Sequence, residues 1–287
     1  MTTIKVSGPF SLSAAVEALD VMAPHRGVDG AYEGWHLIGG RTFNVRVRQV
    51  DARRLVMSVD GTDVERADVD AAEQLVRRMF GLDLDADRFY SETSSEDRVL
   101  RRLQSRMLGV RPITAPTPLA ALVWVLLTDL YGPERARIVL CRLGGGEQAA
   151  DLARLDPAVD ALRLGLEPAT VAHLRQIGER GTTGAFGAEL LSSMPLAAAR
   201  NWLCSHAEVG VTTADAVLVV GAGRRDVVPA ATPQLIAAVA SYYGVARTEA
   251  RRRVDDLSRR WGEFATWAAF LLITAARRDG VSAGATT

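Results

Sequence analysis

The stretch that decides the fold runs from Glu208 to Leu235 and reads EVGVTTADAVLVVGAGRRDVVPAATPQL. Its apolar run ends in Gly221-Ala222-Gly223, and this combination has two incompatible interpretations. An apolar strand that enters a glycine-rich loop is typical of a dinucleotide-binding site. A glycine that precedes an apolar helix, with small residues and a proline after that helix, is typical of a helical hairpin followed by a turn.

The residues that follow argue against the dinucleotide site. A Gly-x-Gly-x-x-Gly fingerprint needs its third glycine where Asp226 stands, and Pro229 follows closely. No neighbouring segments have the pattern of parallel strands, which such a site requires. We therefore predict a helix that starts near Thr213 and ends at the glycines. A hairpin should lie near Cys204 to Ala214, and a turn should run from Gly221 to Pro229.

Composition sets broad limits on the protein. Its 287 residues are 48% hydrophobic and 24% charged, as in an ordinary soluble globular protein. Lys+Arg and Asp+Glu are 34 each, so the total charge does not indicate a nucleic-acid partner. Residues 60–100 contain 12 acidic and 5 basic residues, whereas residues 200–280 contain 8 acidic and 11 basic ones. This segregation favours a C-terminal half that attracts DNA, although ordinary amphipathic helix faces explain it equally well.

Several classes of site are excluded by spacing. Cys141 and Cys204 are the only cysteines, and their separation rules out a cysteine-ligated zinc or iron–sulfur site. The four histidines have no partner spacing for a metal or a catalytic triad, so we expect no metal held by side chains. The longest apolar run, residues 119–127, is about half of what a bilayer span requires. Because no secretory signal is visible, we expect a cytoplasmic protein without a membrane partner.

Two regions differ in their hydrophobic periodicity. In residues 43–49, Phe43, Val45 and Val47 alternate with Arg46 and Arg48, and residues 55–61 follow after a short turn. Such alternation predicts an antiparallel sheet with one exposed face. After residue 90, apolar residues recur at helical spacing almost to the end, with prolines at helix starts and glycines at helix ends. The pattern therefore predicts a mixed N-terminal domain and a helical remainder.

The hairpin supplies the most specific motif in the chain. Val209-Gly210, two further residues and Thr213-Ala214 lead into an apolar helix. Segments 6–19, 119–130, 164–179 and 261–272 stand in the order and spacing of the same pattern. Taken together, these motifs resemble the helix-hairpin-helix DNA glycosylases, and specifically the 3-methyladenine DNA glycosylase II group.

The resemblance implies a fold and a DNA-binding surface. It implies an α+β chain, with a TATA-binding-protein-like antiparallel sheet domain over residues 1–91 and a helical region over residues 92–287. That region would contain a subdomain of residues 115–229 with the helix-hairpin-helix motif, and a second subdomain of residues 92–114 plus 230–287. The residues expected to bind DNA are Val209, Gly210, Val211, Thr212, Thr213 and Ala214, with an apolar wedge at Leu130.

The physical logic of the hairpin supports that surface. Gly210 lets the backbone approach a phosphate closely, and the helix after it presents free N–H groups and its positive dipole end. Such a motif grips the DNA backbone without reading bases. The resemblance implies no cofactor, although it leaves open a monovalent cation held by backbone carbonyls of the hairpin.

Four positions depart from the family pattern. Thr232 stands where the resemblance implies the catalytic Asp, after Asp226 and the Ala230-Ala231 spacer, and a hydroxyl cannot supply the negative charge that an oxocarbenium-like transition state requires. The first hairpin glycine is replaced by Glu208, an aromatic position is Thr212, and the Arg of the last helix is Ala265.

These departures lead to a DNA-binding protein as the predicted function. We expect recognition of bent, damaged or branched DNA through backbone contacts by a monomer, without ordinary base excision. The alternative is an active 3-methyladenine-type glycosylase in base excision repair that uses a non-standard catalytic residue, and a protein-interaction role for the same fold is a third hypothesis. Candidates for such a catalytic residue are the carboxylates Asp215, Glu208, Asp129 and Glu263.

Overall fold

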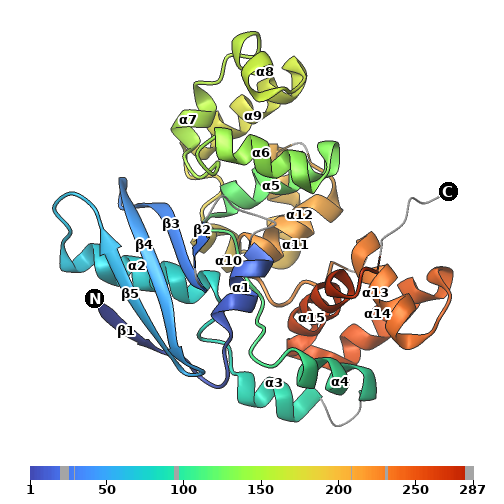
Figure 1. Ribbon diagram of the computed structural model, residues 1–287. Coiled ribbons are helices and arrows are strands. Elements are labelled where there is room, and N and C mark those ends of the chain that lie inside the picture. Colours follow the sequence, from blue (N-terminus) through green and yellow to red (C-terminus); the bar gives the residue numbers. More distant parts are fainter. Residues whose placement is uncertain (20–25, 29, 94–96, 208, 230–231, 282–287) are drawn as a thin grey trace.

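The computed structural model describes residues 1–19, 26–28, 30–93, 97–207, 209–229 and 232–281. One antiparallel sheet and a larger set of helices make up this part of the chain (Figure 1). Its strands are hydrogen-bonded in the order β1-β5-β4-β3-β2. They are β1 (Thr2–Lys5), β2 (Arg26–Val28), β3 (Ala31–Ile38), β4 (Arg41–Asp51) and β5 (Arg54–Asp60).

The sheet has the one-sided character that the sequence predicts. Phe43, Val45 and Val47 on β4 are buried, whereas Arg46 and Arg48, which alternate with the two valines, are exposed. The turn between β4 and β5 lies at residues 52–53, as the sequence indicates. These observations confirm the antiparallel sheet.

The third strand shows where periodicity is not enough. In β3, Tyr32 and His36 face the core, while Trp35 faces outward with 64% of its surface exposed. Because a large aromatic side chain stands on the outer face, the sequence shows no clear alternation of apolar and polar residues. The strand is instead fixed by its antiparallel ladder with β4.

Two helices cover the inner face of the sheet in Figure 1: α1 (Leu12–Leu19) and α2 (Arg66–Met79). Leu12, Leu19, Val76 and Met79 are fully buried and form one hydrophobic cluster with the inward side chains of the strands. This cluster is the core of the N-terminal domain.

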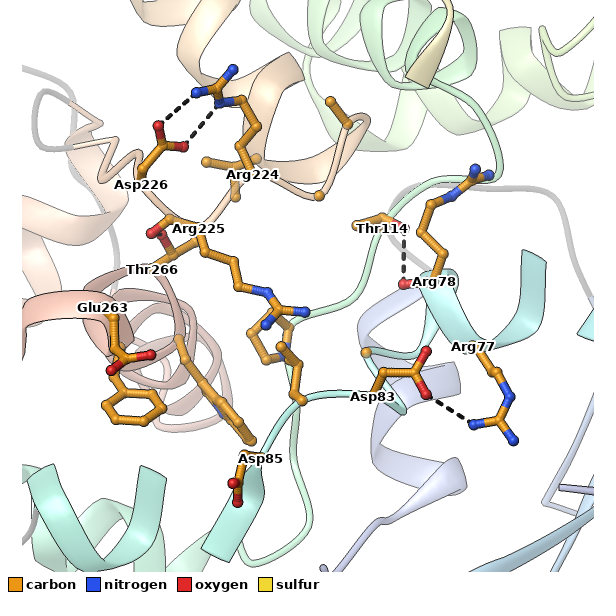
Figure 2. A pocket seen from close by; sticks show the side chains of 18 of the residues that line it. Arg77, Arg78, Asp83, Asp85, Thr114, Arg224, Arg225, Asp226, Glu263 and Thr266 are labelled. Carbon is orange, nitrogen blue, oxygen red and sulfur yellow. Dashed lines mark hydrogen bonds and ion pairs between the residues drawn. The ribbon is translucent and has the colours of Figure 1, made fainter. Parts of the chain in front are cut away.

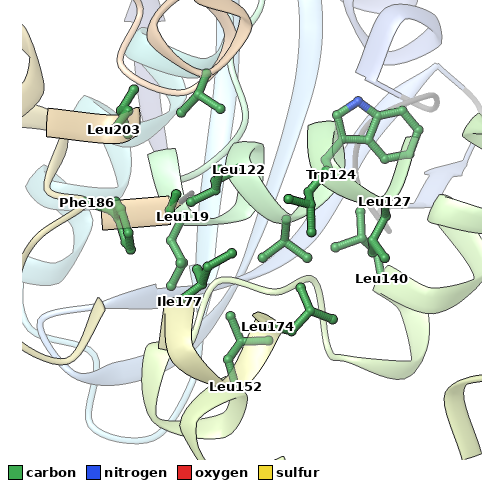
Figure 3. Close-up of a cluster of buried hydrophobic side chains, with 14 of the residues drawn as sticks. Leu119, Leu122, Trp124, Leu127, Leu140, Leu152, Leu174, Ile177, Phe186 and Leu203 are labelled. Carbon is green, nitrogen blue, oxygen red and sulfur yellow. The ribbon is translucent and has the colours of Figure 1, made fainter. Parts of the chain in front are cut away.

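Two further hydrophobic clusters divide the helices. The first surrounds the apolar helix α5, whose Leu122 and Leu127 are fully buried (Figure 3). It is built by α5 (Pro118–Tyr131), α6 (Pro133–Arg142), α7 (Ala149–Ala153), α8 (Val159–Leu164), α9 (Pro168–Gly181), α10 (Ala188–Ser193), α11 (Leu196–Ala207) and α12 (Val211–Val220).

The second helical cluster lies at the other end of the molecule. It is built by α3 (Ala86–Thr93), α4 (Arg98–Arg106), α13 (Pro233–Tyr243), α14 (Arg247–Trp261), the 3-10 turn η1 (Gly262–Phe264) and α15 (Ala265–Arg278). Phe89 of α3 stacks on Trp267 of α15 with 4.1 Å between ring centroids. Because α3 packs here, the chain before residue 91 already contributes to this cluster, and the predicted division at residues 91, 115 and 230 stays a prediction.

Local signals explain the helix ends. Thr117 caps α5 by accepting a hydrogen bond from the backbone N–H of Ala120 at 3.0 Å, and Pro118 occupies the first turn. The helix ends at Gly132, whose φ of +81° favours glycine. The predicted helices that begin at prolines 118, 133 and 168 are all present.

The apolar run before Gly221 forms the helix α12 (Val211–Val220). Val217 and Val220 lie in this helix and not in a parallel strand, so the dinucleotide-loop interpretation is wrong. The helix begins at Val211, two residues before the predicted start near Thr213. The reason is that the carbonyl of Gly210 already accepts the first intrahelical hydrogen bond, from Ala214 N at 2.9 Å.

A buried arginine joins the N-terminal domain to the helices. Arg111 is 1% exposed, and its guanidinium donates hydrogen bonds to five backbone carbonyls, those of Ser7, Pro9, Gly81, Leu82 and Leu84. Burial lowers the pKa of Arg111 to about 10, so the group keeps its charge at neutral pH. One side chain therefore holds two N-terminal segments in place.

Among the described residues, no single helix is long and apolar enough to cross a membrane. The bent pair formed by α11 and α12 passes that test together, by length and composition alone. Its side chains Leu203, Val217 and Leu218 are buried in the first helical cluster.

Candidate nucleic-acid interface

The predicted hairpin is formed by α11, Val209, Gly210 and α12. Two polar side chains of α9 fix the end of α11: His173 Nε2 lies 2.6 Å from the carbonyl oxygen of Ala207, and Arg180 donates to the carbonyl of Ser205 at 3.0 Å. Sequence patterns did not indicate these two hydrogen bonds. Glu208, which the sequence predicts to belong to the hairpin, lies outside the described residues.

Gly210 is not required by the protein's own packing. Its φ of −72° and ψ of 163° are open to any residue. A Cβ at this position would meet no atom of the described chain within 4 Å. The position is also exposed. Neither backbone strain nor crowding within the described chain therefore explains why a glycine stands here.

The first turn of α12 opens toward solvent beside this glycine. Its N-cap residue is Gly210, so within the described residues the N-cap supplies no side-chain acceptor for the first N–H groups of the helix. Val211 and Thr212 are exposed, and Val209 and Thr213 are partly buried. Ala214 is fully buried in the helical core, so its side chain supports the turn from inside.

The predicted wedge lies next to the hairpin. Thr213 Oγ1 donates a hydrogen bond to Asp129 Oδ2 at 3.1 Å, which ties α12 to the last turn of α5. Leu130, the next residue, has 57% of its surface exposed, and Val211 has 58%. The structure thus brings together an uncapped helix N-terminus and two exposed apolar side chains from distant parts of the sequence.

Thr232 occupies the N-cap position of α13. Its Oγ1 donates a hydrogen bond to the carbonyl of Pro229 at 2.9 Å, so the hydroxyl is engaged within its own turn. The spacer residues Ala230 and Ala231 lie outside the described residues. Asp226 forms a two-fold hydrogen-bonded ion pair with Arg224, at 2.6 and 2.9 Å. This side-chain hydrogen bond from Arg224 is the main reason that the pKa of Asp226 lies below its usual range.

Each described candidate for a substitute catalytic carboxylate already has a donor. Asp215 is nearly buried and accepts two hydrogen bonds from Arg200, at 2.5 and 3.0 Å. Glu263 pairs with Arg88 at 2.8 Å, and Asp129 accepts from Thr213. Among the described residues, no group of three or more His, Cys, Asp or Glu side chains could hold a metal ion.

A cavity that the sequence did not indicate lies near the other end of α12 (Figure 2). Its volume is about 650 Å³, and its walls come from the N-terminal domain and from both helical clusters. Val219 of α12, Arg225 of the following loop and Trp267 of α15 all line it. Thr266 Oγ1 donates to the carbonyls of Arg225 and Val227, at 2.6 and 2.7 Å, and so fixes this loop against α15.

Comparison with known proteins assigns the fold. No protein-family model matches the sequence, and no curated protein matches it. Among solved structures, the 3-methyladenine DNA glycosylase from Archaeoglobus fulgidus superposes with a TM-score of 0.83, over 98% of this chain and 100% of that one, at 18% sequence identity. This chain has the fold of the helix-hairpin-helix DNA glycosylases.

Two further structures agree with this assignment. The Clostridium acetobutylicum 8-oxoguanine glycosylase/lyase, in complex with double-stranded DNA, gives a TM-score of 0.73 at 14% identity, over 98% of this chain and 99% of that one. The Schizosaccharomyces pombe 3-methyladenine DNA glycosylase, in complex with abasic DNA, gives 0.56 at 17% identity, over 66% of this chain and 97% of that one. The sequence resemblance is therefore confirmed at the level of the fold.

Proposed function

We propose that this protein binds DNA through the hairpin around Gly210 and the N-terminus of α12, and that it does so without excising alkylated bases. The observation that carries the proposal is the glycine itself. Position 210 is exposed, unstrained and uncrowded by the described chain, so the absent side chain serves an approach from outside. A DNA phosphate is the partner that suits a close backbone approach beside uncapped helix N–H groups.

The surroundings of the hairpin support recognition of DNA structure. Leu130 at the C-terminal end of α5 and Val211 at the N-terminal end of α12 are exposed apolar side chains. An apolar wedge inserts most easily where base pairs unstack at low cost. Phosphate contacts carry no sequence information, so affinity should depend on the form of the DNA and fall steeply with salt.

The absence of base excision is proposed from the local chemistry. Thr232 is neutral, and its hydroxyl is bonded within its own turn. Asp215, Asp129 and Glu263 are each held by a hydrogen-bond donor of the chain. None of these groups is an unpartnered carboxylate that could stabilise positive charge on a sugar.

The test compares two added arginines. Fluorescence anisotropy should measure the affinity of the wild type, Gly210→Arg and Leu162→Arg for duplex, abasic, single-stranded and branched DNA at several salt concentrations. Leu162 lies on α8 with 89% of its surface exposed, so its arginine adds the same charge away from the hairpin. Gly210→Arg should weaken every DNA form by about tenfold or more, because its side chain blocks backbone hydrogen bonds to phosphate.

Two results would contradict the proposal. If Gly210→Arg binds DNA as tightly as Leu162→Arg, the hairpin is not the DNA-binding site. A parallel base-release assay on alkylated DNA should give no 3-methyladenine above background, and clear release by the wild type would show that the chain is an active glycosylase.

A further inference from the structure

The cavity of Figure 2 is separate from the hairpin surface. It lies beyond the C-terminal end of α12, whose N-terminal end carries the hairpin. Its volume of about 650 Å³ falls in the range of small-molecule sites, about 300–1,000 Å³. Such sites combine mostly apolar walls with a few fixed polar groups, so the charges and the walls decide what this one can hold.

Most of the charges around the cavity neutralise one another. On the side of the cavity formed by the N-terminal domain, Asp83 accepts a hydrogen bond from Arg77 at 2.9 Å. The pairs Arg88–Glu263 at 2.8 Å and Arg224–Asp226 at 2.6 Å close two other sides. These ion pairs leave little charge to offer a ligand.

Arg225 differs from them. Its side chain points into the cavity (Figure 2), and no carboxylate of the described chain lies within ion-pair distance of it. Its backbone carbonyl is held by Thr266, which fixes the root of the side chain. Asp85 is the lining carboxylate without a side-chain partner among the described residues, and it accepts a hydrogen bond from the backbone N–H of Arg88 at 3.0 Å. The guanidinium of Arg225 is therefore a lining donor without an ion-pair partner among the described residues, and the carboxylates Asp83 and Glu263 act on it only at longer range.

Apolar and aromatic side chains stand beside this guanidinium. Phe264 and Trp267 line the cavity together with Leu84 and Pro112. The Trp267 indole is held in place because it stacks on a neighbouring ring and its Nε1 donates to the carbonyl of Val110 at 3.1 Å. A rigid aromatic wall favours a planar ring, since stacking costs the ligand little conformational freedom.

We propose that this cavity binds a small planar aromatic acid, with its ring against the wall of Phe264 and Trp267 and its single oxyanion on the guanidinium of Arg225. Guanidinium matches carboxylate and phosphate oxygens in a bidentate geometry, so either acid group satisfies the chemistry. The inference does not depend on the proposed DNA-binding function.

Isothermal titration calorimetry of the full chain tests the proposal with two acids and their neutral counterparts. Indole-3-carboxylate and AMP supply the carboxylate and the phosphate monoester, and indole and adenosine are the same rings without the acid. At least one acid should bind with saturation, and its neutral counterpart should bind about tenfold more weakly or worse. The acid that binds more tightly identifies the preferred oxyanion.

Variants locate the site. Arg225→Ala should weaken binding of that acid by about tenfold or more, whereas Arg225→Lys should retain part of it. Arg252→Ala, an exposed arginine on α14, is the matched control and should bind like the wild type. Gly210→Arg should also bind the acid normally, which separates this site from the hairpin. Failure of both acids to bind at millimolar concentration, or unchanged binding in Arg225→Ala, would overturn the proposal.

Discussion

Replacement of Arg111 by Met tests how the N-terminal domain is joined to the helices. Arg111 is 1% exposed, and Met has a similar length and no donors, so the change removes hydrogen bonds while largely keeping the packing. Five backbone carbonyls would lose the Arg111 donor, and of these the carbonyl of Gly81 would keep a hydrogen bond from Leu84 N at 3.2 Å. We expect a clear loss of folding free energy.

The magnitude follows from two opposing effects. Burial that lowers the pKa of Arg111 to about 10 corresponds to a penalty of about 3 kcal/mol on the charged form. Hydrogen bonds from a charged donor stabilise by about 1.5 kcal/mol or more each, and five of them give about 7 kcal/mol. The hydrogen bonds outweigh the penalty, so Arg111→Met should lower the free energy of unfolding by about 4 kcal/mol.

Urea unfolding followed by tryptophan fluorescence and circular dichroism measures this difference. Coincidence of the two signals checks for two-state behaviour. Arg98→Met, at an exposed position on α4, is the control and should change the free energy of unfolding by less than about 0.5 kcal/mol. A loss below about 1 kcal/mol for Arg111→Met would refute the reasoning, because burial and hydrogen bonding would then nearly cancel.

Two further predictions concern the DNA surface. Leu130→Ala should reduce the preference for abasic and branched DNA over plain duplex while leaving duplex affinity within about two-fold, because the change removes only the wedge; equal losses on all forms in anisotropy would argue against that role. Thr232→Asp should leave base release from alkylated DNA at background, because a carboxylate alone supplies no pocket for a flipped base; measurable excision by this single variant would show that only the charge was missing.

Local patterns were enough for most of the secondary structure. Alternation at Phe43, Val45 and Val47 predicted β4, and Pro118 and Gly132 marked the ends of α5, because side-chain periodicity and backbone preferences act over a few residues. The hairpin at Gly210 was also predicted, since a glycine, a short spacing and an apolar helix are all visible in one stretch.

Tertiary structure decided what the sequence could not. In the sequence, Arg225 is one arginine among many, and Trp267 is one residue of an apolar helix. Only the packing of α12, α15 and α2 places them around one cavity. The wedge at Leu130 was placed from the resemblance, but its position beside the hairpin depends on the packing of α12 against α5, which the Thr213–Asp129 hydrogen bond joins across 84 residues. The same holds for Arg111, whose carbonyl partners lie 27 to 104 residues away. Periodicity indicates which face of a helix or strand is buried, but long-range packing determines which other elements cover that face. Both the hairpin surface and the cavity are formed by residues that only this long-range packing brings together.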